Sequence, residues 1–207
     1  MVRSHHAGDT TGGTTAGGDA VTEYRPATIL GCWVTLIAAV VLFITGDWQG
    51  KLMFQQQPMK MASAESLCHS DVDPNFSVLT VGTHNNCDGV IHLIEVPFVL
   101  PFLAEGKFSG VHLEGVEDLQ AQFEEKFGPG DYRPNLFVTY WSFRAMIGFL
   151  AVPVLFALVA LWLTRGRRIP NHRWFSRFAL LTIPTPFLAN SAGWVFTEKS
   201  RKPWVVK

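Results

Sequence analysis

The chain has 207 residues, of which 48% are hydrophobic and 13% aromatic. Lysine and arginine together number 17, as do aspartate and glutamate, so the formal net charge is zero. This balance argues against a basic nucleic-acid-binding protein and against an acidic disordered one. Residues 1–24 are rich in Gly and Thr, and they carry too little apolar surface to offset chain entropy. We expect a disordered tail there, with His5 and His6 solvated rather than bound to a metal.

Three apolar runs follow the tail. Residues 28–46 contain no charge, and residues 141–164 contain one arginine near their start. Each run is long enough to cross about 30 Å of hydrocarbon as a helix, which predicts two transmembrane helices. Residues 178–197 are also uncharged but include Pro184 and Pro186, which favours a bent third span packed against protein. The predicted fold class is an all-α membrane protein with three transmembrane helices.

Charge in the loops predicts the orientation of these helices. The connection 165–177 holds five arginines and no acidic residue, so the positive-inside rule places it in the cytoplasm. The N-terminus is then cytoplasmic, while residues 198–207 and the long segment 47–140 are extracytoplasmic.

The long segment 47–140 should contain short helices. A helix is predicted after Pro58, and a second, amphipathic one over 116–127. Residues 90–103 are strongly apolar but too short to span, which indicates an interfacial stretch. Cys68 and Cys87 both lie in the segment, where oxidising conditions would allow a disulfide. Two free thiols are the alternative.

Lys60 and Glu65 are candidate site residues because they follow soon after the first span. Five positions separate them, which on a helix is about 140°, so they do not form an ideal ion pair. They are still able to flank a shared pocket. A quinol releases protons when it is oxidised, so its site needs a base near water and apolar walls. A solvated loop helix is an equally good interpretation of these two residues alone.

Arg144 and Met146 lie at the start of the second span. A charge at that depth needs a reason, and a thioether is a soft ligand for iron or copper as well as a packing group. The two residues are about 200° apart around a helix, so they face nearly opposite ways. Every histidine lies outside the three spans. A buried heme would therefore use Met146, Glu198 or a residue from elsewhere.

Three motifs together carry a family resemblance. They are WSFRAM at 141–146, QPMKMASAE at 57–65, and GWVFTE at 193–198, the last followed by Arg201-Lys202-Pro203-Trp204. Taken in their order along the chain, they resemble subunit I of cytochrome bd-type quinol oxidases, of an actinobacterial kind, over about residues 24–206. The resemblance implies a terminal oxidase that oxidises quinol at the outer face and reduces oxygen to water. It also implies that the segment 47–140 corresponds to the loop that the family calls the Q loop.

The resemblance further implies cofactors, partners and site residues. The cofactors are a low-spin heme b, a high-spin heme b and heme d. Met146 resembles the axial ligand of the low-spin heme, with Arg144 beside it, and Lys60 and Glu65 match the quinol-oxidation residues. Glu198, Trp194 and Arg201 correspond to residues near the high-spin heme and heme d. The implied setting is the bacterial plasma membrane, with a second subunit, quinol and lipid as partners.

Two departures from the family pattern matter. Ser200 stands where the family usually has Gly, and Lys202 where it has Gln. A serine there conflicts with a left-handed backbone, and the lysine adds a charge near the hemes that the resemblance implies. Family members also carry more helices, including those with the histidine ligands of the hemes. We therefore expect a C-terminal portion of subunit I that is inactive without the N-terminal part. The alternative is a non-catalytic remnant, or a membrane protein with an extracytoplasmic interaction domain.

Overall fold

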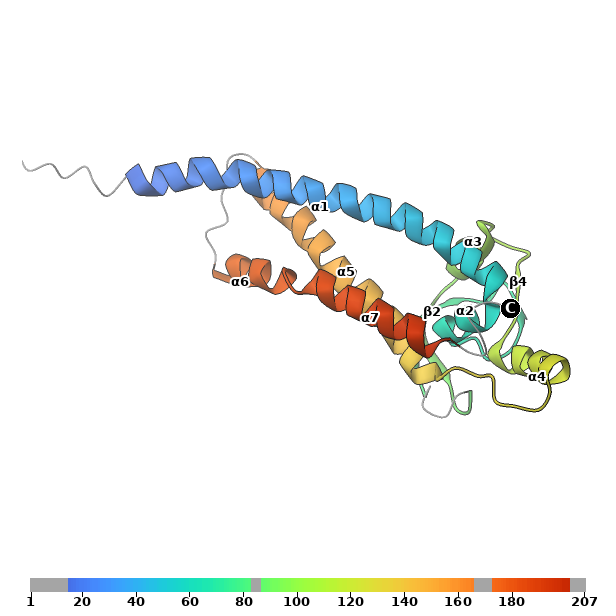
Figure 1. Ribbon diagram of the computed structural model, residues 1–207. Helices are drawn as coiled ribbons and strands as arrows, with labels where there is room; N and C mark the ends of the chain where they lie inside the picture. The colour runs from blue at the N-terminus through green and yellow to red at the C-terminus, as the bar shows by residue number, and fades with distance from the viewer. Residues whose placement is uncertain (1–14, 83–86, 166–172, 202–207) are drawn as a thin grey trace, which may run out of the picture.

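The computed structural model describes residues 15–82, 87–165 and 173–201. The elements in chain order are α1 (Thr15–Gln56), α2 (Pro58–Glu65), β1 (Asp71–Val72), β2 (Phe76–Val81), β3 (Ile91–Val96), α3 (Val99–Glu105), β4 (His112–Leu113), α4 (Val116–Phe127), α5 (Leu136–Thr164), α6 (Arg173–Thr182) and α7 (Thr185–Lys199). Long helices form an elongated part, and the small elements gather at one end of it (Figure 1). We call residues 57–135, between α1 and α5, the connecting segment.

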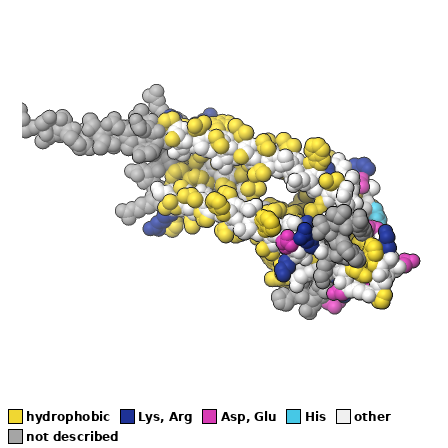
Figure 2. Space-filling model, in the orientation of Figure 1, with side chains coloured by type: hydrophobic (Ala, Val, Ile, Leu, Met, Phe, Trp, Pro, Cys, Tyr) yellow, Lys and Arg dark blue, Asp and Glu magenta, His cyan; other side chains and the backbone are white. Residues whose placement is uncertain are grey.

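Two helices are long and apolar enough to cross a membrane. They cover Arg25–Gln56 and Leu136–Thr164, and few of their side chains are buried within the chain. Hydrophobic side chains cover the visible surface of the elongated part, whereas charged side chains gather at the connecting segment and near the opposite end (Figure 2). This distribution is typical of helices that face lipid between two polar boundaries.

The third predicted span is not one continuous helix. Helix α6 ends at Thr182 and α7 begins at Thr185, with Pro184 between them. Proline lacks the amide hydrogen that a continuing helix would use, and its ring disfavours helical backbone in the preceding residue. The interpretation that this segment bends is therefore confirmed, whereas a single helix over 178–197 is wrong. Helix α7 packs along α5, as Figure 1 shows.

Helix α1 is longer than the sequence suggested. It has 42 residues, about 63 Å at 1.5 Å per residue, and it begins at Thr15, inside the stretch expected to be disordered. It ends at Gln56 because Pro58 forces Gln57 out of the helical region, to φ −137° and ψ 64°. His5 and His6, which were expected to be solvated rather than bound to a metal, lie outside the described residues.

Small side chains bring α1 and α5 together. Cys32 on α1 packs with Ala157 and Ala160 on α5, and all three are buried. Small residues allow close helix approach in an apolar environment. At the same end Arg25 Nη2 donates a 3.2 Å hydrogen bond to the backbone oxygen of Thr164. That oxygen belongs to the last turn of α5, where carbonyls lack partners within the helix, so Arg25 caps it.

The connecting segment is not all-helical, which corrects the predicted fold class to a mostly helical one. Strands β1 and β4 pair antiparallel, and so do β2 and β3. Residues 90–103, expected to be one interfacial stretch, form β3 and α3 separated by a turn at Phe98 with φ 65°. The β-branched residues Ile91, Ile94 and Val96 favour the strand, and Pro97 ends it. The helices predicted after Pro58 and over 116–127 are confirmed as α2 and α4.

Two apolar clusters and a disulfide hold the connecting segment together. One cluster joins α2, α4 and the start of α5, and the other joins α3 with β4. The Cys68–Cys87 disulfide is confirmed, with the two Cα atoms 5.6 Å apart. Gly115 precedes α4 and lies against the backbone of Cys68 and His69, where any side chain would clash. This close approach fixes α4 against the chain that follows α2.

Candidate functional site

A buried ion pair joins α2 to α5. Arg144 Nη2 lies 2.7 Å from Glu65 Oε2, and the side chains are 11% and 3% exposed respectively. Glu65 is the last residue of α2, and Arg144 lies two turns into α5. Two residues predicted separately, one for quinol oxidation and one beside the low-spin heme, are therefore in direct contact. Removal from water raises the pKa of the Glu65 carboxyl, and Arg144 opposes this rise.

Arg144 is held on several sides. Its Nε and Nη2 donate to the backbone oxygen of Ser77 at 3.2 and 2.5 Å, and Tyr140 donates to the same oxygen at 3.3 Å. The guanidinium carbon lies 4.5, 4.8 and 5.4 Å from the ring centres of Phe76, Tyr140 and Phe143. Nη1 is buried and has no hydrogen-bond partner among the described residues. One donor of this fixed cation therefore remains free to meet an anionic group.

A polar cluster on β2 and β3 supports the Ser77 carbonyl. Ser77 Oγ lies 2.5 Å from Thr80 Oγ1, and both oxygens lie 3.0 Å from His92 Nδ1. The strand pairing is irregular between Ser77 and Thr80, so two hydroxyls on one strand reach the same imidazole. Ser77 and Thr80 are buried. This cluster fixes the bulge that presents the Ser77 carbonyl to Arg144.

Lys60 faces α7 rather than α5. Its Nζ lies 4.9 Å from the ring centre of Phe196, a cation–π contact. Partial burial lowers the pKa of Lys60, Arg201 lowers it further, and Glu198 opposes both effects. Lys60 and Glu65 thus leave α2 in different directions, as their 140° separation predicts.

An aromatic pair lies between the two cations. Phe143 of α5 and Phe196 of α7 have ring centres 5.0 Å apart. Arg144 lies against the first ring and Lys60 against the second. Phe196 is buried at 5% exposure. The pair therefore connects Lys60, predicted for quinol oxidation, with Arg144, predicted beside the low-spin heme.

Met146 lies at the contact between α5 and α7. A Cβ atom placed on Gly193 would lie 3.0 Å from Met146 Sδ, so the absence of a side chain at Gly193 makes room for the thioether. Met146 is half-buried. Its sulfur and the free Nη1 of Arg144 are a soft ligand and an anion-binding donor two residues apart, which fits the edge of a heme site.

The remaining predicted residues lie toward the end of α7. Arg201 Nη1 approaches Glu198 Oε2 at 3.3 Å, with both side chains about half exposed, and Trp194 is 65% exposed. Ser200 has φ −91°, which any residue adopts, so the expected conflict with a left-handed backbone does not arise. Lys202 lies outside the described residues.

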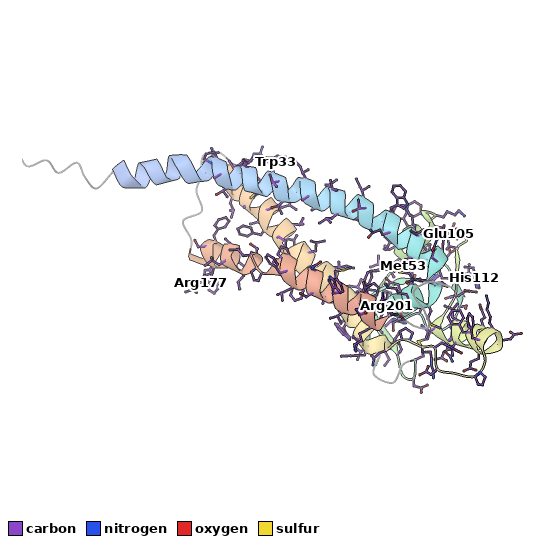
Figure 3. The ribbon with its side chains drawn as sticks, in the orientation of Figure 1. Trp33, Met53, Glu105, His112, Arg177 and Arg201 are labelled. Carbon is purple, nitrogen blue, oxygen red and sulfur yellow. A yellow bond between two sulfur atoms is a disulfide. The ribbon has the colours of Figure 1, made fainter. Side chains whose placement is uncertain are left out.

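A cavity of about 320 Å³ lies between the end of α1, α2, α3 and β4. Glu65 forms part of its wall, whereas Lys60 does not, so the two residues do not share this pocket. Its lining comprises Phe54, Gln55, Pro58, Met61, Ala62, Glu65, Leu67, Leu100, Ala104, Glu105, His112, Leu113 and Glu114. Figure 3 shows Glu105, His112, Met53 and Arg201 at the same end of the molecule, far from Trp33 and Arg177.

The sequence did not reveal several of these residues. Ser77, Tyr140 and Phe196 belong to common residue types in unremarkable patterns, and only the fold brings them to Arg144 and Lys60. One feature of the sequence pointed to the Glu65–Arg144 pair. Each residue is a charge flanked by apolar or small residues, and a buried charge needs a partner. The described histidines, His69, His92 and His112, all lie in the connecting segment.

Comparisons with known proteins agree on one family. The family model described as cytochrome bd terminal oxidase subunit I matches residues 14–207. The chain is 41% identical over 175 residues to cytochrome bd ubiquinol oxidase subunit 1 of Bacillus subtilis (strain 168), covering 84% of this chain and 37% of the relative. It is 27% identical over 188 residues to the putative cytochrome bd menaquinol oxidase subunit I of the same organism, covering 88% and 39%.

A solved structure is similar as well. The bd oxidase from Geobacillus thermodenitrificans superposes with a TM-score of 0.70 at 26% identity, over 92% of this chain and 41% of that one. The chain therefore spans about two fifths of the length of these relatives. On the family match and these similarities, the chain belongs to the cytochrome bd terminal oxidase subunit I family.

Proposed function

We propose that this chain forms the quinol-oxidising face, and part of the heme-binding face, of a bd-type terminal oxidase. In this proposal the connecting segment lies on the outer side of the bacterial plasma membrane, and the loop 165–177 lies in the cytoplasm. The carrying observation is the buried Glu65–Arg144 pair, which joins α2 to the helix that bears Met146. A proton acceptor and a heme-side cation are thereby in contact.

Glu65 is the proposed base that takes a proton from quinol. Its raised pKa favours proton uptake, and Arg144 fixes the orientation of the carboxylate. Lys60 is proposed to bind a quinol oxygen, because a lysine whose pKa is lowered is able to donate a hydrogen bond and also to release a proton. The aromatic pair Phe143 and Phe196 supplies an apolar surface between Lys60 and Arg144.

Met146 and Arg144 are proposed to hold one side of the low-spin heme b. Bound there, the heme would supply a one-electron acceptor beside the quinol site. Met146 would provide a thioether ligand for the iron, and Nη1 of Arg144 would donate to a propionate. The described histidines lie in the connecting segment, so the second axial ligand is proposed to come from outside the described part of the chain.

The end of α7 is proposed to face the high-spin heme b and heme d. Glu198, Trp194 and Arg201 are the residues assigned to these hemes. Lys60 is proposed to connect them to the quinol site, because Arg201 and Glu198 both act on the pKa of Lys60. Trp194 is exposed in the isolated chain, as a residue that packs on a cofactor or another polypeptide would be. The proposed partners are subunit II, the N-terminal part of subunit I, and quinol.

Two measurements on the assembled oxidase test this function. Met146→Leu should abolish the low-spin heme band in reduced-minus-oxidised spectra, while Met59→Leu, a matched change in the buried core of the connecting segment, should leave it intact. Glu65→Gln should lower steady-state quinol oxidation at least about 100-fold, in the range typical of a lost general base. The exposed Glu125→Gln serves as its control. Normal spectra with Met146→Leu, or normal turnover with Glu65→Gln, would contradict the assignment.

A further inference from the structure

The cavity beside α2 offers Glu65 a second environment. Glu65 is 4% exposed, and its Oε2 is engaged by Arg144 at 2.7 Å. A guanidinium stays charged and accepts no proton, so Arg144 cannot relay one. A proton taken up by Glu65 must therefore leave in another direction. At the cavity wall this carboxyl adjoins a space large enough for solvent.

The cavity is suited to water and to proton movement. At roughly 30 Å³ per molecule, its 320 Å³ corresponds to about ten waters, and water in proteins needs polar partners. Such partners are present on both sides, with Glu65 at the inner wall and Glu105, His112 and Glu114 toward the solvent. Leu100 and Ala104 are buried in the wall between them. A buried titratable group, Glu65, and three less buried ones thus line the same cavity.

We infer that this cavity is the exit route for the proton that Glu65 takes from quinol, with His112 as the principal acceptor at its mouth. The inference rests on the proposed quinol-oxidising function. Each of the two O–H bonds of the quinol breaks in turn, and its proton passes to the Glu65 carboxylate, then to cavity water and His112. The electron left by each O–H would be taken up by the one-electron acceptor that a bound heme supplies. Glu65 thereby returns to the carboxylate for the second proton.

Of the three groups on the solvent side of the cavity, Glu105, His112 and Glu114, the contacts of the other two favour His112 as the acceptor. Glu105 is paired with Lys107 at 2.9 Å, and Glu114 accepts a 3.1 Å hydrogen bond from Gln122. His112 is exposed, and its side chain makes no hydrogen bond within residues 15–82, 87–165 and 173–201, while the nearby Asp118 is engaged by Ser70. A neutral imidazole has one nitrogen with a lone pair, which is able to accept a proton from water.

The test uses the assembled oxidase and two kinds of variant. Ala104→Leu fills the cavity, with Ala121→Leu on the exposed face of α4 as its control. His112→Ala removes the proposed acceptor, with Glu125→Gln as an exposed control. Both test variants should lower kcat for quinol oxidation about tenfold, with unchanged KM, unchanged heme spectra and an increased solvent isotope effect. Added imidazole should restore kcat in His112→Ala.

The outcomes separate this inference from the proposed function. Unchanged kcat in both variants would overturn the exit route, even if Glu65→Gln is inactive. A higher KM for quinol with unchanged kcat in Ala104→Leu would assign the cavity to the substrate and also overturn it. Failure of the proposed function would appear differently, as full activity of Glu65→Gln.

Discussion

Removing the charge of Arg144 should destabilise the chain far more than removing a charge from an exposed ion pair. Arg144→Gln leaves the Glu65 carboxylate buried without its partner, at 3% exposure. Breaking such a pair from one side costs about 3–5 kcal/mol. Glu65→Gln should cost less, about 1–3 kcal/mol, because Arg144 keeps its two bonds to Ser77 and its aromatic contacts. The double variant should be more stable than the sum of the two predicts, by at least about 2 kcal/mol.

The assay is thermal unfolding of the purified full chain in detergent, followed by tryptophan fluorescence. At roughly 2–4 °C per kcal/mol for a chain of this size, Arg144→Gln should lower the midpoint by about 10 °C. Arg133→Gln is the control, because the Arg133–Glu117 pair at 3.1 Å has both side chains about one third exposed and should contribute under about 1 kcal/mol. Equal effects of the two arginine changes, or strict additivity of the Arg144 and Glu65 changes, would refute the reasoning.

Three further predictions follow from single contacts. Gly193→Ala should displace the Met146 sulfur and shift the low-spin heme band, whereas an unchanged spectrum would separate Met146 from the heme. Replacing Cys68 and Cys87 by Ser should lower the free energy of unfolding by about 3 kcal/mol, since the disulfide closes a loop of 19 residues. Quinol oxidation should decline as pH falls through the raised pKa of Glu65, because the protonated acid is no base. That decline should therefore start at a higher pH than for an exposed glutamate, and a profile without it would exclude Glu65.

The long helices could be predicted from the sequence because hydrophobic length is a local property. Uncharged runs over 28–46 and 145–164 predict helices of membrane length, and Pro184 predicts the bend between α6 and α7. The strands of the connecting segment could not be predicted in the same way. Strand β3 is short and exposed on both faces, so it has no strong alternation of buried and solvated positions.

The motifs supply the candidate site residues, but the contacts among those residues could not be predicted. Lys60, Glu65, Arg144 and Met146 were identified from motifs, yet their separation along the chain gives no sign that Glu65 meets Arg144. That contact spans a sequence separation of 79, over which the chain folds so that the end of α2 returns to the start of α5. The cavity depends on four separate elements and has no local signature.

Anaerobic reduction of the heme by quinol tests the central claim most directly, because it separates electron entry from oxygen chemistry. The assembled oxidase is mixed with quinol in a stopped-flow instrument, and heme reduction is followed for the native chain and for Glu65→Gln. The account predicts that heme reduction slows at least about 100-fold in the variant, while dithionite still reduces the heme fully. Equal rates of quinol-driven reduction in the two proteins would contradict it.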